Sequence, residues 1–445
     1  NKTGKLLPIF SDHCANGFKN KLSPYEIVNS FFKIYCEDFS EVEMKTLLFR
    51  FIQYIERQVV LFDAIEDASF PHINNLDGIG TLRNIKEAFE KSSSKETLIK
   101  YLKKIKIKPV LTAHPTQFYP GSVLGIITDL SYAIENNDLI EIKSLLAQLG
   151  KTPFFKKKKP TPYDEAVSLT WYLENMFYNS ISNIQKYIKS NIADNKFINY
   201  DLISLGFWPG GDRDGNPYVT NEITIKTAFK LRSDIIKNYY RDVRKLRRRL
   251  TFQNVEDVVI DIENRLYISM DEELENPSIS LDELKEKLLF VRKKIIKDHE
   301  SLFLEQVEEL IDKVNIFGYH FASLDIRQDS GIHNDVFKRI LKEKFGIKMS
   351  KKYLEMNEDD KINFLSNSKF KSNINDFSDS IVLKTLGSIN AMRNIQKSNG
   401  EKGCHRYIIS HNESALNLFE VFYMFKFTGW INPTVDIVPL FETID

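Results

Sequence analysis

Five short apolar segments, separated by long helical patterns, restrict this chain to a small set of folds. The segments cover residues 108–113, 202–207, 317–326, 404–410 and 434–441. Strands that are connected through helices pair in parallel, because a parallel crossover needs a dozen or more residues. We therefore predict an α/β fold that is predominantly helical, with an incomplete parallel (β/α) barrel and large helical additions. Residues 1–106 are predicted as a helical amino-terminal region, and residues 107–445 as the barrel with helical insertions.

Local patterns support this helical content. Ser23-Pro24-Tyr25-Glu26 is a capping box with proline at the first helical position, and Ser280-Leu281-Asp282-Glu283 is a second capping box. Helical patterns follow over residues 221–250 and again up to about residue 314, as one long helix or a helical pair. Residues 350–380 are polar and rich in Ser, Asn and Asp, which predicts a mobile surface connection.

Each predicted strand ends in residues that can do chemistry. These residues are His114, Asp212 with Arg213, Arg327, His411 and Glu442. In a parallel barrel the carboxyl ends of the strands share one mouth, where active sites lie. We therefore expect these side chains to contribute to a single site.

The stretch from Leu205 to Thr220 is crowded with glycine and charge. Gly210 and Gly211 allow the backbone to approach a ligand, and Arg213 can hold an oxyanion through two parallel hydrogen bonds. The alternative is a tight turn whose aspartates cap a helix. The stretch fits neither an EF-hand, which needs glutamate at the twelfth position, nor a Walker A loop, which needs Gly-Lys-Ser/Thr.

The other strand-end residues also have structural alternatives. His114 precedes a proline, so it lies at a strand end or in a loop, where a catalytic and a structural role are equally favoured. For His411 a structural role is favoured, because Asn412-Glu413 is typical of a helix start. Arg327 could simply pair with an acid, and Glu442 could bind magnesium, although a single carboxylate indicates little.

Composition excludes several classes of protein. The 445 residues include 62 basic and 61 acidic side chains, for a net charge of +1, which gives no support to nucleic-acid or membrane-surface binding. No apolar run approaches the roughly 20 residues that span a bilayer. The three cysteines lie far apart and form no metal-binding spacing. A reducing cytoplasm is the simplest location.

Four motifs resemble those of phosphoenolpyruvate carboxylase. They are Val110–Gln117 with the histidine, the glycine-rich Gly210–Pro217, Leu324–Ser330 and Val438–Thr443. The motifs are separated and occur in the family's order, so the resemblance is specific. It covers at least residues 107–445 and implies a barrel of the phosphoenolpyruvate carboxylase type.

The resemblance implies a reaction and roles. The family converts phosphoenolpyruvate and bicarbonate to oxaloacetate and phosphate, through carboxyphosphate and the enolate of pyruvate, with Mg²⁺ or Mn²⁺ and without biotin. By this resemblance His114 would be the general base, and Arg327 would neutralise phosphate charge. Arg213, with residues Gly210, Gly211 and Asp212, would bind substrate. Glu442 would supply one ligand of the metal that holds the enolate oxygen.

The chain also departs from the family pattern. Gln117 stands where glutamate is common, and Pro120 and Val123 replace basic residues. A further metal-binding aspartate and a glycine- and arginine-rich loop have no counterpart, so we expect an amino-terminal fragment that is inactive alone. The full-length family member is expected to be a cytoplasmic homotetramer. The alternative function is a helical scaffold that contributes assembly or effector contacts without catalysis.

Overall fold

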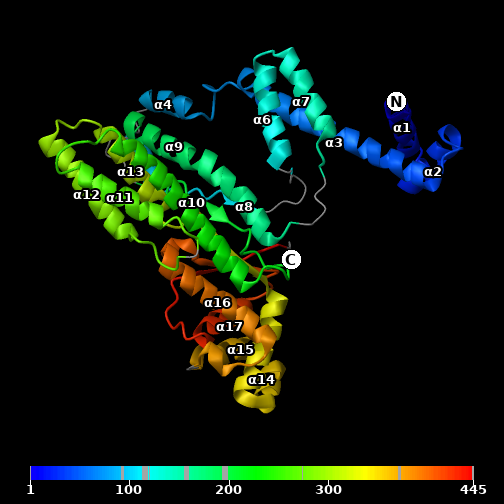
Figure 1. The fold of residues 1–445 in the computed structure, drawn as a ribbon. Coiled ribbons are helices and arrows are strands. Elements are labelled where there is room, and N and C mark those ends of the chain that lie inside the picture. The colour runs from blue at the N-terminus through cyan, green and yellow to red at the C-terminus, as the bar shows by residue number, and fades with distance from the viewer. Residues whose placement is uncertain are drawn as a thin grey trace. The chain divides into compact units, whose positions relative to one another are not determined.

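The computed structural model describes residues 2–91, 95–112, 119, 121–154, 160–192, 199–272, 274–368 and 372–442. Contacts group the chain into two compact units (Figure 1). The first contains residues 1–81 and 114–159, and the second contains residues 82–113 and 160–445. The predicted domain boundary at residue 106 stays a prediction.

The first unit is helical. Its helices are α1 (Lys2–Lys19), α2 (Pro24–Tyr35), α3 (Glu41–Ile73), α6 (Gly121–Glu135) and α7 (Leu139–Lys151). The predicted capping box is confirmed at α2, where Ser23 and Glu26 each accept a hydrogen bond from the other's backbone amide. Val60 and Ala64 of α3 share a buried core with Val123 and Leu130 of α6.

The second unit contains a five-stranded parallel sheet. Its strands are β1 (Val110–Leu111), β2 (Gly206–Phe207), β3 (Ser323–Asp329), β4 (Arg406–Ser410) and β5 (Asp436–Pro439). Neighbours in the sheet are neighbours in the chain, in the order β1-β2-β3-β4-β5, and every pair is parallel. The predicted parallel α/β arrangement is therefore confirmed. Closure of the sheet into a barrel stays a prediction, because β1 and β5 are the edges of the sheet within the described residues.

Helices make up most of the second unit. Those preceding β3 are α4 (Leu82–Glu90), α5 (Lys95–Leu102), α8 (Pro162–Tyr172), the π-helix η2 (Leu173–Phe177), α9 (Tyr178–Asn191), α10 (Asn221–Arg247), α11 (Glu256–Ile268), α12 (Leu281–Asp298) and α13 (Leu304–Phe317). Those following β3 are α14 (Ser330–Glu355), α15 (Glu358–Asn367), the short 3₁₀ helices η3 (Ile374–Asp376) and η4 (Glu401–Gly403), α16 (Ser380–Asn399) and α17 (Ala415–Phe427).

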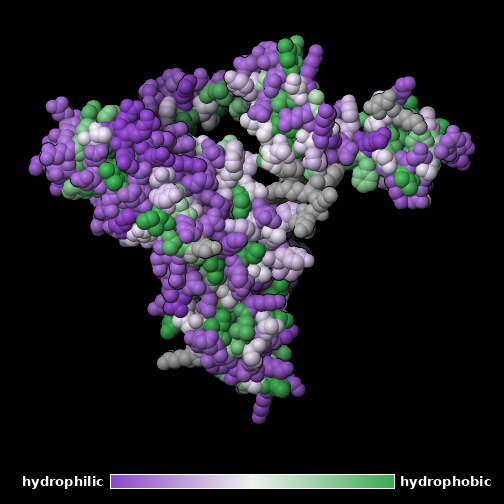
Figure 2. Space-filling model, viewed as in Figure 1, coloured by the Kyte–Doolittle hydropathy of each residue, from purple (hydrophilic) through white to green (hydrophobic). Residues whose placement is uncertain are grey.

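The core of the second unit surrounds the sheet. Leu324 and Ile326 of β3 are fully buried, as are Ile235 and Tyr239 of α10. One continuous apolar cluster includes residues of β2, β3, β4 and the helices that pack on them. The surface over α11 and α12 is mostly hydrophilic (Figure 2), as expected for helices that bury only one face. The strands are thus held in place by apolar packing against the helices.

Some local predictions were wrong. The strand predicted over residues 317–326 begins only at Ser323, because α13 continues to Phe317. Residues 350–380 are not merely a surface connection, since they include the end of α14, α15 and the buried Leu365. The second capping box is half formed: Ser280 accepts from the Glu283 amide, but the Glu283 carboxylate binds Arg265.

The helical pair predicted up to residue 314 is confirmed as α12 and α13. Among the helices in the described ranges, none combines the length and the apolar composition that crossing a membrane requires.

Candidate active site

The glycine-rich stretch lies directly against β3. A Cβ atom at Gly211 would lie 2.2 Å from the carbonyl oxygen of Asp325, so only glycine permits this approach. The Arg213 amide donates to the Arg327 carbonyl at 2.9 Å, and the Arg327 amide donates to the Gly211 carbonyl at 3.2 Å. The loop therefore extends the parallel pairing beyond β2 and brings its aspartates to the end of β3.

A second glycine sets the turn of the loop. Gly210 has a φ of +79°, and a Cβ atom there would lie 2.3 Å from the Thr227 hydroxyl of α10. Its carbonyl accepts a hydrogen bond from Thr224 at 2.7 Å. The loop is thus fixed on one side by the sheet and on the other by α10, as preorganised binding loops are.

Arg327 lies at the centre of the resulting cluster. Its Nη1 is 3.2 Å from Asp212 Oδ2, and its Nη2 is 3.0 Å from Asp214 Oδ2 and 3.3 Å from Glu442 Oε1. The guanidinium carbon lies 5.3 Å from the centroid of the Trp208 ring, a cation–π distance. Four strand-end residues that were predicted to share a mouth are therefore neighbours: Asp212, Arg327, His411 and Glu442.

His411 joins this cluster from the end of β4. Its Nδ1 is 2.7 Å from Asp329 Oδ2, and its Nε2 is 3.4 Å from Glu442 Oε2. The helix predicted to start at Asn412-Glu413 begins at Ala415 instead, behind its Ser414 cap. The residue has a φ of +48°, and its carbonyl accepts a hydrogen bond from Ser330.

The cluster shifts the pKa of its members in different directions. Burial raises the pKa of Asp212 against the opposing attraction of Arg327. Burial would also raise the pKa of Asp329, but hydrogen bonds from His411 and from the Gly331 amide hold it below its ordinary value. The hydrogen bond with Asp329 and the charge of Glu442 raise the pKa of His411. A proton is therefore favoured on the imidazole.

Arg213 points elsewhere than Arg327. Its Nη1 donates to Asn221 Oδ1 at 3.1 Å and to the Lys384 carbonyl at 3.2 Å. Burial lowers the pKa of its guanidinium. These contacts hold the start of α10 against α16, and its predicted role in anion binding stays a prediction.

A buried ion pair supports the cluster from within the sheet. Lys108, just before β1, has its Nζ 3.3 Å from Asp325 Oδ1, and the two side chains are 12% and 2% exposed. Trp208 Nε1 donates to the other carboxylate oxygen of Asp325 at 3.3 Å. The tryptophan that lies against Arg327 is thereby tied to β3. Sequence reasoning missed this pair, because its partners are separated by 217 positions.

Four further residues concern the histidine motif and its flank. His114, Gln117 and Pro120 lie outside the described residues, so the predicted role of His114 as general base stays a prediction. Val123 is fully buried in α6. A charged side chain would be costly there without a partner, which accounts for the apolar residue.

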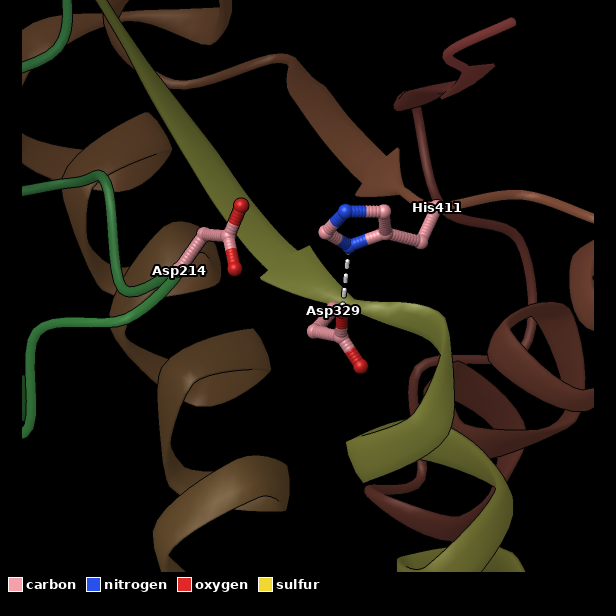
Figure 3. Close-up of side chains that lie close together, drawn as sticks. All are labelled: Asp214, Asp329 and His411. Atoms are coloured by element: carbon pink, nitrogen blue, oxygen red, sulfur yellow. Dashed lines mark hydrogen bonds and ion pairs between the residues drawn. The ribbon is translucent and has the colours of Figure 1, made fainter. Parts of the chain in front are cut away.

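Three side chains of the cluster offer ligand atoms to one point. Among the described residues, Asp214, Asp329 and His411 present oxygen and nitrogen atoms that all lie within 4.8 Å of one another. Figure 3 shows that they come from the glycine-rich loop, the end of β3 and the end of β4. Sequence reasoning included only His411 among its candidates, although Asp214 and Asp329 both follow predicted strands and could have been found by the same rule.

Comparison with known families agrees with the motifs. The family model described as phosphoenolpyruvate carboxylase matches residues 66–278 and 267–445. The match includes all five strands and every member of the strand-end cluster, so it covers the site together with the fold that positions it.

Proposed function

The chain belongs to the phosphoenolpyruvate carboxylase family, and we propose that its strand-end cluster forms part of a site that makes oxaloacetate and phosphate from phosphoenolpyruvate and bicarbonate. The observation that carries this proposal is Arg327, held at the end of β3 by Asp212, Asp214 and Glu442. A guanidinium fixed in this way is preorganised for the oxygens of a phosphoryl group.

Charge at the cluster supports a metal-dependent reaction. Four carboxylates, those of Asp212, Asp214, Asp329 and Glu442, surround Arg327 and His411. A doubly charged phosphate would be repelled by this excess of negative charge. The oxygen-rich donor set suits Mg²⁺ or Mn²⁺, and Glu442 would be one ligand. The bound ion would supply positive charge next to the substrate oxygens.

The chain's own residues then act on the reacting atoms. An oxygen of bicarbonate attacks phosphorus, and the bond from phosphorus to the enol oxygen breaks, which leaves carboxyphosphate and the enolate. Arg327 neutralises charge on the transferred phosphoryl group. His114 accepts the carboxyphosphate proton as carbon dioxide and phosphate separate, and the enolate carbon then attacks carbon dioxide. The roles of His114 and of Arg213 rest on the family motifs.

The test is a comparison of Arg327→Gln with Arg327→Lys. Loss of a preorganised donor to an oxyanion lowers kcat by about 10² to 10³, so Arg327→Gln should lower oxaloacetate formation by that factor. Lysine keeps the charge but lacks the forked geometry and should recover only part of the rate. Turnover by Arg327→Gln equal to that of the unchanged protein would contradict the proposal.

The assay should use a form of the protein that shows turnover, with residues 1–445 measured in parallel. We still predict that residues 1–445 alone have no carboxylase activity. Bicarbonate-dependent oxaloacetate formation by residues 1–445 would contradict this prediction. His114→Asn should abolish turnover in the active form. Dependence on Mg²⁺, tetramer assembly and a cytoplasmic location are further predictions from family membership.

A further inference from the structure

We propose that Asp214, Asp329 and His411 bind a divalent transition-metal ion, at a position beside the oxygen site proposed for Glu442. The ligand atoms of these three residues lie within 4.8 Å of one another, a separation that modest closure around an ion would reduce. In Figure 3 the carboxylates of Asp214 and Asp329 both lie near the imidazole ring of His411, and the hydrogen bond drawn joins the ring to Asp329.

Glu442 sets the ring nitrogen that would bind the ion. Glu442 Oε2 is 3.4 Å from His411 Nε2, so this carboxylate favours a hydrogen on Nε2. Nδ1 donates to Asp329 in the metal-free chain, so a bound ion would displace this proton and take the Nδ1 lone pair while Nε2 keeps its hydrogen. A metal-binding histidine commonly donates its other N–H to a carboxylate, and this contact fixes the tautomer and the ring orientation.

Each aspartate has one oxygen that an ion could reach. Asp329 Oδ1 accepts from the amides of Gly331 and Ile332 and caps α14, and its Oδ2 accepts from His411 Nδ1 at 2.7 Å, the contact that the ion would replace. Asp214 forms its ion pair with Arg327 through one oxygen, Oδ2, at 3.0 Å. Because a carboxylate has two oxygens, neither contact has to break completely when an ion binds.

The donor set selects the class of ion. Mg²⁺ and Ca²⁺ prefer ligand sets made of oxygen, whereas an imidazole with two carboxylates suits ions such as Mn²⁺, Fe²⁺, Co²⁺ and Zn²⁺. The competing explanation is a protonated His411 that only forms ion pairs with Asp329 and Glu442. A direct binding measurement separates these two explanations.

The experiment is a titration of the purified, untagged 445-residue chain with Co²⁺, followed by visible absorption and calorimetry with Mg²⁺ in excess. His411→Asn suits the test because asparagine tolerates positive φ. Asp329→Asn suits it because asparagine also caps helices. We expect each variant to weaken Co²⁺ binding by at least about tenfold. The matched control is His72→Asn, an exposed histidine of α3, which should bind Co²⁺ as the unchanged chain does.

Two outcomes would overturn the proposal. One is the absence of Co²⁺ binding to the unchanged chain, which would leave His411 as an ion-pair partner only. The other is binding that survives His411→Asn and Asp329→Asn but is lost in Glu442→Gln, which would assign the ion to the oxygen site. In the proposed arrangement Glu442→Gln weakens binding only by about tenfold, through the ring orientation.

A second measurement does not depend on the folding of any variant. Proton NMR of the unchanged chain with Co²⁺ should show one strongly shifted, solvent-exchangeable imidazole signal from the Nε2 hydrogen of His411. A spectrum without such a signal at saturating Co²⁺ would contradict coordination through Nδ1. Both readouts report binding, so they remain informative if the chain has no carboxylase activity.

Discussion

Two clusters of opposite charges lie along β3, and they differ in balance and burial. In the inner one, Lys108 and Asp325 form a single pair whose side chains are 12% and 2% exposed. Trp208 completes the pair by donating to the second oxygen of Asp325. Every charge there has a partner, and the arrangement leaves little to bind.

The outer cluster, at the end of the same strand, is unbalanced. Arg327 is 20% exposed and faces three carboxylates, those of Asp212, Asp214 and Glu442. His411, 59% exposed, adds one cationic group at most and brings Asp329 with it. Excess negative charge that is open to solvent attracts cations, whereas a balanced buried pair serves the fold. The balance and burial of the charges therefore distinguish the structural ion pair from the candidate binding site on the same strand.

The largest expected effect comes from breaking the buried pair. Asp325→Ala would leave the Lys108 ammonium buried without its partner, so we expect a loss of about 3–5 kcal/mol in the free energy of unfolding, measured in urea. The double replacement Lys108→Met with Asp325→Leu should recover most of this loss, because an apolar pair carries no desolvation cost. A loss below about 1 kcal/mol for Asp325→Ala would remove the distinction between the clusters.

Glu420 is a buried carboxylate without a close cation among the described residues, and it can be compared with Asp325, which has one. Glu420 in α17 accepts a hydrogen bond from the Tyr353 hydroxyl at 3.2 Å. Its Oε2 has no hydrogen-bond partner within the described part of the chain. Burial raises its pKa from 4.5 to about 7, against the opposing effects of the Tyr353 bond and nearby lysines.

The sign of the pH dependence follows from this raised pKa. Glu420 holds its proton more tightly in the folded state than in the unfolded state. The resulting stabilisation of the folded state is complete below pH 4.5 and is lost as the pH rises through about 7. We expect the free energy of unfolding to fall by about 1.4 kcal/mol per pH unit across this interval. Glu420→Gln should flatten that slope in urea titrations at several pH values, and an identical slope in the variant would count against the assignment.

Replacing glycines tests how the outer cluster is held. Gly211→Ala would push a methyl group against the Asp325 carbonyl, and we expect a cost of about 1–3 kcal/mol together with displacement of Asp212 from Arg327. Gly215→Ala is the control: it has a φ of +67° but open space around a Cβ, so only the backbone cost of about 1–2 kcal/mol applies. If both variants had equal stability in urea and equal Co²⁺ affinity, the close packing of Gly211 against the Asp325 carbonyl would not be what holds the outer cluster in place.

The smallest effect on stability is expected from replacing a carboxylate of the outer cluster. Asp212→Asn removes one of several carboxylates around Arg327 and relieves repulsion, so we expect a change within about 1 kcal/mol in the free energy of unfolding. Urea unfolding beside Asp325→Ala gives the direct comparison. If Asp212→Asn lowered the free energy of unfolding as much as Asp325→Ala does, the outer cluster would be a structural ion-pair network.

Much of this arrangement could be predicted from local sequence. The alternation of apolar segments with helical patterns predicted parallel strands, and the rule for strand ends brought together Asp212, Arg327 and Glu442. The lengths of the strands could not be predicted, because β2 contains only Gly206–Phe207 and its pairing extends through an irregular loop. A structural role was favoured for His411, because local propensity describes neither its positive φ nor its partner 82 positions away.

By itself the sequence determined the family, the parallel order of the strands and the set of residues at their ends, since these depend on local patterns and on motifs in order. Only the tertiary structure decided which charges are balanced. Arg213 and Arg327 look alike in the sequence, yet one guanidinium binds Asn221 and a backbone carbonyl while the other binds three carboxylates. The physical reason is that charge balance and burial depend on distances between segments, which residue types and spacing do not contain.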